Sequence, residues 1–132
     1  RIDEIPRPAS TSNPGLLTDL IWSEPALDAS QRGLRRSDKG VGYIFGVDVV
    51  DQFLEKYDLG HIVRSRNVCQ AGYDFLYGKK LITVFSRPNT VEYYGAKLHN
   101  DGAFMKIDDE MDVSFAILKG TEKPKTIFTG TE

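Results

Sequence analysis

Apolar residues fall in three short runs within residues 59–89, and polar turn residues separate these runs. The runs are 61–63, 73–76 and 81–85, and the turns between them include 70–72 and 78–80. Short apolar runs bounded by glycine-containing turns are typical of β-strands, so we predict three strands here. Polar side chains follow the first and third runs, where loops leave a sheet and commonly carry function. They are Arg64, Arg66, Asn67, Arg87 and Asn89.

Apolar residues recur with a helical period over residues 47–57. The apolar residues that recur at i, i+3, i+4 and i+7, and so share one face, are Val50, Phe53, Leu54 and Tyr57. Gly60 follows and suits the end of the helix. A second, shorter helix is predicted over residues 16–22, because Pro25 prevents it from continuing.

The C-terminal part of the chain predicts a β-hairpin. Its strands are residues 103–107 and 112–118, and apolar residues alternate in the second strand so that one face is apolar. We divide the chain into an extended lead-in (1–15), one folded segment (16–119) and a loosely held tail (120–132). Residues 26–40 mix charge with glycine and predict a basic surface loop.

Composition places the 132 residues among ordinary soluble domains. Hydrophobic residues make up 40%, and 19 acidic against 17 basic residues give no general indication of nucleic-acid binding. No apolar run approaches the roughly 20 residues of a membrane span, so no membrane partner is expected. Cys69 is the single cysteine, which favours a reducing, intracellular location in the cytoplasm or nucleus. Because the first residue is Arg1 rather than Met, we expect a fragment or a processed product.

Four stretches follow an order of motifs known from one protein family. Residues 15–25 read Gly-Leu-Leu-Thr-Asp-Leu-Ile-Trp-Ser-Glu-Pro, and residues 39–46 read Lys-Gly-Val-Gly-Tyr-Ile-Phe-Gly. Residues 81–89 read Leu-Ile-Thr-Val-Phe-Ser-Arg-Pro-Asn, and residues 105–119 end in Ser-Phe-Ala-Ile-Leu-Lys. In this order the motifs resemble the C-terminal half of the serine/threonine phosphoprotein phosphatases, most closely the type-1 protein phosphatase.

The resemblance implies a fold and a cofactor. The expected fold class is α+β, the C-terminal part of a metallophosphoesterase-type β-sandwich with a mixed sheet and two helices. Enzymes of this family use two divalent metals of the manganese, iron or zinc class, which bind the phosphate and activate a water molecule. The family's Gly-Asp-x-His-Gly, Gly-Asp-x-Val-Asp-Arg-Gly and Gly-Asn-His-Glu motifs are absent from this sequence. We therefore expect no metal and no catalytic residue in this chain alone.

The positions that match the family's remaining site residues also depart from its pattern. Arg66 stands where the family has a metal-ligating histidine, and a guanidinium offers only hydrogen-bond donors. Lys39 replaces a phosphate-contacting arginine, and so keeps the charge but loses the bidentate geometry. Glu24 replaces an aspartate and Thr90 a tyrosine, while Asn89 matches the family.

Arg66 supports two hypotheses. In the first, a former metal site has drifted, and the arginine now pairs with a carboxylate or is solvated. In the second, fixed cations replace the metal charge and hold a phosphate without cleaving it. The candidate phosphate-binding residues are Lys39, Arg66 and Asn89, with Arg64 or Arg87 as further cations.

A docking groove is a second family feature implied by the resemblance. Type-1 phosphatases accept a regulatory peptide as an added edge strand, with apolar pockets for alternate side chains. The matching positions are His61, Phe75, Met111, Val113 and Phe115. Ordinary core packing would explain the apolar members of this set equally well.

Three functions remain open at this point. The leading hypothesis is a serine/threonine phosphatase-like segment that is inactive as this chain stands. One alternative is part of an active metal-dependent phosphatase whose N-terminal half is missing. The other is a non-catalytic module that binds docking peptides or phosphate. The partners expected under these hypotheses are regulatory-subunit peptides or the missing N-terminal half.

Overall fold

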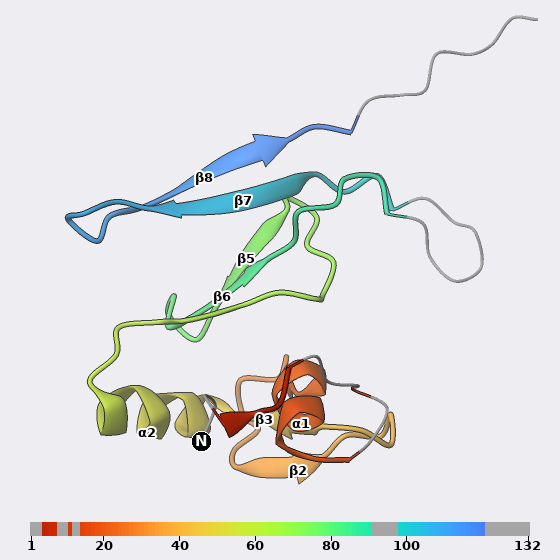
Figure 1. Cartoon of the computed structure of the whole chain (residues 1–132), viewed down its shortest axis with the longest axis vertical. Coiled ribbons are helices and arrows are strands. Elements are labelled where there is room, and N and C mark those ends of the chain that lie inside the picture. The colour runs from red at the N-terminus through yellow and green to blue at the C-terminus, as the bar shows by residue number, and fades with distance from the viewer. Residues whose placement is uncertain (1–3, 8–10, 12–13, 91–97, 121–132) are drawn as a thin grey trace, which may run out of the picture. The chain divides into compact units, whose positions relative to one another are not determined.

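A computed structural model describes residues 4–7, 11, 14–90 and 98–120 of the chain (Figure 1). The chain divides into two compact units. The first comprises residues 1–66 and 75–83, and the second comprises residues 67–74 and 84–132. Each unit is therefore assembled from two separate stretches of the sequence.

Two helices lie in the first unit, and both have the predicted bounds. Helix α1 spans Leu16–Trp22 and helix α2 spans Val47–Tyr57. Near the start of α2, both carboxylate oxygens of Asp48 accept a hydrogen bond from the Gly33 N–H at 2.9 Å. The helix ends at Asp58, which takes the left-handed conformation with φ 52°. The expectation that Gly60 closes this helix is therefore wrong, because an aspartate tolerates that conformation and ends the helix earlier.

A small mixed sheet in the same unit contains β1 (Glu24–Pro25), β2 (Leu34–Arg36) and β3 (Tyr43–Phe45). Strand β3 is central, parallel to β1 and antiparallel to β2. The prediction of a surface loop over residues 26–40 is wrong at β2, where the exposed residues form a strand. Strand β2 lies at the edge of the described sheet, and all three of its residues are exposed. Because no face of this strand is buried, its sequence shows no alternation of apolar and polar residues.

The three strands predicted within residues 59–89 are confirmed with small shifts in their bounds. They are β4 (Ile62–Arg64), β5 (Tyr73–Leu76) and β6 (Leu81–Val84), in the order β4-β6-β5. Strands β4 and β6 are parallel, and Ile62 pairs with Leu81.

The core of the first unit lies between α2 and these strands. Val50 and Leu54 of α2 pack with Leu81 of β6, and partly buried side chains surround them. The Tyr77 hydroxyl donates hydrogen bonds to the carbonyl oxygens of Ala26 at 2.6 Å and Phe45 at 3.2 Å, which ties the turn after β5 to the small sheet.

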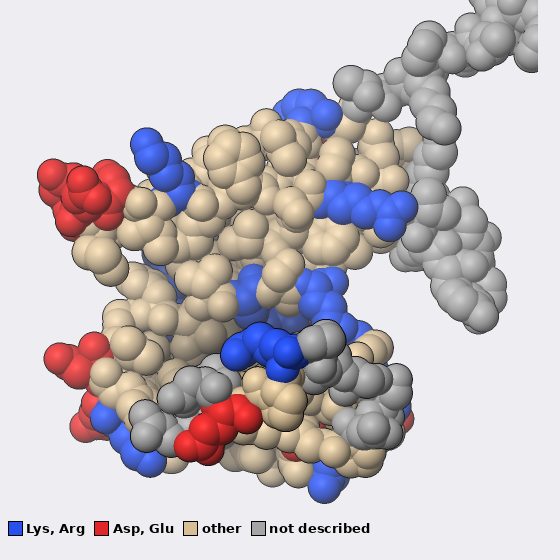
Figure 2. All heavy atoms as spheres, viewed as in Figure 1, with Lys and Arg blue, Asp and Glu red and all other residues tan. Residues whose placement is uncertain are grey.

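The second unit contains the predicted hairpin. Strands β7 (Gly102–Ile107) and β8 (Val113–Leu118) are antiparallel, and Met105 pairs with Phe115. Figure 2 shows acidic side chains gathered at the tip of this hairpin, where residues 108–110 are exposed. Buried Asn100 precedes β7, and its amide donates to the carbonyl oxygens of Arg87 and Asp101, each at 2.8 Å.

A close approach of two backbones shapes the second unit. Gly72 has φ +80°, and a Cβ at this position would lie 2.4 Å from the carbonyl carbon of Gly102. Only glycine accommodates both that conformation and that proximity. The Gly72 carbonyl also accepts a hydrogen bond from the Phe85 N–H at 2.7 Å.

The observed elements confirm the predicted fold class, a mixed α+β assembly with two helices. The boundaries proposed at residues 16 and 119 stay predictions, and most of the predicted tail lies outside the described residues. Among the residues with a described structure, no helix is long and apolar enough to cross a membrane.

Leu81→Ala tests the core of the first unit. Leu81 is 0% exposed whereas Leu27 is 87% exposed, so Leu27→Ala is a matched control for the same change of side chain. We expect Leu81→Ala to lower the free energy of unfolding by about 2–5 kcal/mol, because it leaves a cavity. Leu27→Ala should change it by less than about 0.5 kcal/mol. Urea unfolding monitored by circular dichroism measures both, and equal effects would contradict this description of the core.

Candidate functional site

Glu24 on β1 gathers two of the predicted site residues around one carboxylate. Lys39 Nζ donates to Glu24 Oε1 at 2.9 Å and to Oε2 at 2.7 Å. Arg66 Nη1 donates to Glu24 Oε1 at 3.0 Å. The exposed fractions of the side chains are 14% for Glu24, 31% for Arg66 and 55% for Lys39. The carboxylate is therefore the most buried charge of the cluster, and we call these three residues the Glu24 cluster.

Arg66 also contacts an aromatic ring. Its guanidinium carbon lies 3.9 Å from the centroid of the Trp22 ring, a cation–π arrangement. Arg66 has φ 94°, which is unusual for a residue with a long side chain. Such a conformation costs about 1–3 kcal/mol and persists only where surrounding contacts fix it. Glu24 and Trp22 provide those contacts.

Hydrogen bonds and one close approach of two backbones position the segments that carry the Glu24 cluster. Ser23, directly after α1, accepts a hydrogen bond at Oγ from the Tyr43 N–H at 3.0 Å and so joins α1 to β3. Gly42 has φ +67°, and a Cβ there would lie 2.6 Å from the carbonyl carbon of Trp22. Lys39 sits in the turn between β2 and β3, where its N–H donates to Ser37 Oγ at 3.3 Å.

Opposing effects act on the pKa of Glu24. Burial raises this pKa, but hydrogen bonds and charge attraction from Lys39, followed by those from Arg66, outweigh burial and hold it below its ordinary value of 4.5. The carboxylate is therefore ionised at neutral pH, and the cluster carries two positive charges against one negative charge.

The residues of this cluster do not fit a metal ion. The resemblance puts a metal ligand at position 66, but the side chain there is a guanidinium that already donates to Glu24. Guanidinium groups stay protonated and cannot ligate a cation. Within residues 4–7, 11, 14–90 and 98–120, no group of three or more His, Cys, Asp and Glu side chains could hold a metal ion.

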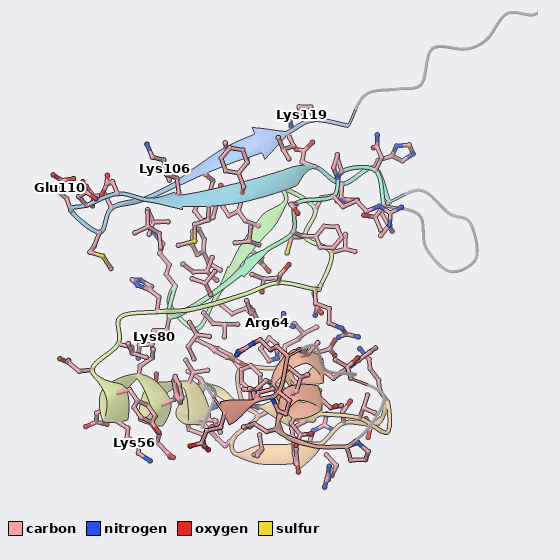
Figure 3. All side chains as sticks on the ribbon, in the orientation of Figure 1. Lys56, Arg64, Lys80, Lys106, Glu110 and Lys119 are labelled. Atoms are coloured by element: carbon pink, nitrogen blue, oxygen red, sulfur yellow. The ribbon has the colours of Figure 1, made fainter. Side chains whose placement is uncertain are left out.

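Asn89 and Arg64, two further candidates for phosphate binding, belong to other segments of the chain. Asn89 belongs to the second unit and has φ 51°. Arg64, which is labelled in Figure 3, ends β4 in the first unit. Its Nη1 donates to Thr83 Oγ1 at 3.4 Å. Lys39 and Arg66 both pair with Glu24. Phosphate binding by Lys39, Arg66 and Asn89 stays a prediction.

The residues of the predicted docking groove are divided between the two units. His61 and Phe75 belong to the first unit, and Lys79 Nζ lies 5.7 Å from the centroid of the Phe75 ring. Met111, Val113 and Phe115 belong to the hairpin of the second unit. The Phe115 ring stacks on Tyr73 with centroids 4.1 Å apart. The groove as a whole stays a prediction.

The first unit also contains an apolar groove that the sequence did not indicate. Both helices and strands β2, β3 and β4 line it, and its volume is about 390 Å³. The apolar period over residues 47–57 indicates a buried face in general, and no signal in the sequence distinguishes a filled interior from an open groove.

The structure matches part of a serine/threonine phosphatase. One matching structure is a protein serine/threonine phosphatase of Saccharomyces cerevisiae that is described as similar to human phosphatase PP5. The two share 27% sequence identity with a TM-score of 0.71, over 92% of this chain and 39% of that chain. This chain therefore spans well under half the length of the matched phosphatase. No protein-family model matches the sequence.

Glu24→Gln tests the ion pairs of the cluster. A depressed carboxyl pKa contributes stability that is fully present above the unfolded-state value and is lost as pH falls through the folded-state value. We expect Glu24→Gln to lower the free energy of unfolding by about 1–2 kcal/mol at neutral pH, given the exposure of Lys39. The difference from the wild type should shrink as pH falls below 4.5.

Asp38→Asn is the matched control for this measurement. The Asp38 side chain is 93% exposed and lies 3.6 Å from Arg35, so its removal should change stability by less than about 0.5 kcal/mol at every pH. Urea unfolding between pH 3 and pH 8 gives both curves. If the loss of unfolding free energy in Glu24→Gln did not depend on pH, that result would contradict the ion pairs assigned to Glu24.

Proposed function

Because the fold is shared with part of a serine/threonine phosphatase, we propose that this chain is a phosphatase-like segment that does not hydrolyse phosphoproteins as it stands. The type-1 phosphatase is the branch of the family that we propose as its relative. A fold is maintained by packing, whereas an activity depends on particular side chains. The chain can therefore keep a phosphatase fold without keeping phosphatase activity.

The observation that carries the proposal is the ion pair between Arg66 and Glu24. A metal-dependent phosphatase needs a lone-pair donor, an imidazole nitrogen or an oxygen atom, at each ligand position. Arg66 supplies a permanent positive charge there, and its partners Glu24 and Trp22 hold it in place. An active phosphatase completed by a separate N-terminal half is less well supported, because the completed site would still contain this guanidinium.

Hydrolysis of a chromogenic aryl phosphate tests the proposal. The purified chain is assayed with manganese titrated in, and its metal content is measured in parallel. We expect no turnover above the metal-only blank and no stoichiometric metal. An active serine/threonine phosphatase assayed beside it is the positive control. Metal-dependent turnover by the purified chain would overturn the proposal.

Retention of phosphate without hydrolysis is a second candidate function. Its support is the excess positive charge of the Glu24 cluster, together with the exposure of Lys39. Such a site would hold a phosphate oxygen by charge-assisted hydrogen bonds. Glu24 competes for the same donors, so the affinity would be modest.

Titration with inorganic phosphate and with a phosphoserine peptide tests this second candidate. We expect Lys39→Gln to reduce affinity at least fivefold, since it removes one of the cations. Lys106→Gln, which removes an exposed lysine from β7, should leave affinity unchanged. Undetectable binding by the wild type would contradict this second function. An equal loss of affinity in both variants would also contradict it.

A further inference from the structure

Strand β8 forms one edge of the hairpin in the second unit. Its register with β7 continues to Asp108 and Asp112, where the Asp108 N–H donates to the Asp112 carbonyl oxygen at 3.2 Å. Hydrogen-bonding groups alternate in direction along an antiparallel strand, so the N–H and C=O groups of Val113 and Ile117 point away from β7. Among the residues that the structure describes, no strand pairs with β8 on that side. The outer edge of β8 therefore presents backbone donors and acceptors to a further strand.

The outer edge of β7 differs from that of β8. The Ala103 N–H on β7 donates to the Phe85 carbonyl oxygen at 2.9 Å, so this edge is partly occupied. Strand β7 also contains Lys106, and a lysine on an edge strand discourages pairing with another strand. Strand β8 reads Val-Ser-Phe-Ala-Ile-Leu and contains neither a charged residue nor a proline. Of the two strands, β8 is therefore the one suited to further pairing.

Apolar side chains of β8 remain partly in solvent. The exposed fractions are 39% for Val113, 41% for Ile117 and 39% for Leu118. Val113 and Ile117 share one face of the strand, because successive side chains alternate between faces. A strand paired along β8 would cover this apolar surface and also satisfy the outward backbone groups. Main-chain hydrogen bonds together with side-chain contacts are what give affinity when a strand is added to a sheet edge.

Opposite charges lie at the two ends of the hairpin. Glu110 lies at the tip and Lys119 at the other end, as Figure 3 shows. Asp108 and Asp109 beside Glu110 are also exposed, and the Lys119 side chain is 77% exposed. Two hairpins that pair antiparallel place the acidic tip of each copy beside Lys119 of the other, whereas parallel pairing would bring the acidic tips together. Charge complementarity therefore favours an antiparallel pair of identical hairpins.

We propose that β8 pairs antiparallel with β8 of a second copy of this chain, so that the two hairpins form one four-stranded sheet. A twofold axis passes through Phe115, and Val113 of each copy lies opposite Ile117 of the other. Cross-strand pairs of aromatic and β-branched side chains stabilise such an arrangement. The same surface of each copy forms the interface, so the assembly closes at two copies.

The mass of the full chain in solution tests the dimer. Light scattering after size-exclusion chromatography, run at loading concentrations from about 1 μM to about 1 mM, covers the dissociation constants expected of a small interface. We expect a monomer at the low end of this range and a dimer at the high end. A chain that stays monomeric throughout would overturn the proposal.

Two matched substitutions locate the interface. Ile117 and Ile21 are both 41% exposed, and Ile21 lies on α1 in the first unit. Ile117→Lys places a charge on the paired strand and should raise the dissociation constant of the dimer about tenfold or more. Ile21→Lys should leave this constant unchanged. Val113→Lys replaces Ile117→Lys if circular dichroism shows that the latter fails to fold, and an undiminished dimer in the folded β8 variant would overturn the proposal.

An exchange of charges tests the antiparallel arrangement. Lys119→Glu should weaken the dimer about fivefold, because it sets a negative charge beside the acidic tip of the other copy. The double variant Lys119→Glu, Glu110→Lys restores opposite charges at the two ends and should recover the affinity. Lys119 also pairs with Asp101, so Asp101→Asn is the control for loss of that ion pair and should leave the dimer intact. If the double variant recovers no affinity, the antiparallel pairing is wrong.

Two other modes of pairing are outcomes of the same measurements. Open-ended assemblies in place of a dimer would mean that both edges of the hairpin pair, and would overturn the proposal. A monomer that binds an Arg-Val-x-Phe type peptide, and loses it in Ile117→Lys, would assign the edge to a regulatory peptide and overturn the proposal too. The dimer does not rest on the proposed function, so turnover in the hydrolysis assay would leave it unchanged.

Discussion

Glu24 lies on a two-residue strand, and its carboxylate is shielded from most of the solvent. Withdrawal of an ion from water costs several kcal/mol unless counter-charges and hydrogen bonds accompany it. Lys39 and Arg66, which are 15 and 42 residues away in the sequence, supply both. The turn after β2 and the segment after β4 are therefore held against β1. Trp22 adds an aromatic surface for the Arg66 guanidinium.

The fold of this chain does not depend on the metal chemistry that the resemblance implies. Packing of Val50 and Leu54 of α2 on Leu81 of β6 needs no metal, so the fold can persist when a ligand position changes. A histidine at position 66 would be neutral or weakly basic, whereas an arginine is always positive. A positive charge there favours a carboxylate partner and excludes a cation.

Periodicity in the sequence determined most of the regular structure. The helical period over residues 47–57 and the short apolar stretch over residues 16–22 correspond to α2 and α1. Helix α2 buries Val50 and Leu54 on one face. Apolar runs between turns located β5, β6 and the β7–β8 hairpin within one or two residues. The small sheet was not found. Its strands are short, and the exposed edge strand β2 shows no alternation.

The sequence by itself determined which residues carry charge, which faces are apolar and that Arg66 cannot bind a metal, since these are properties of side chains and local spacing. Only the tertiary structure decided that Glu24 is the partner of both Lys39 and Arg66. It also decided that the apolar faces of α1 and α2 leave an open groove. Both depend on the distances between segments far apart in the chain, which folding sets and local sequence patterns do not encode.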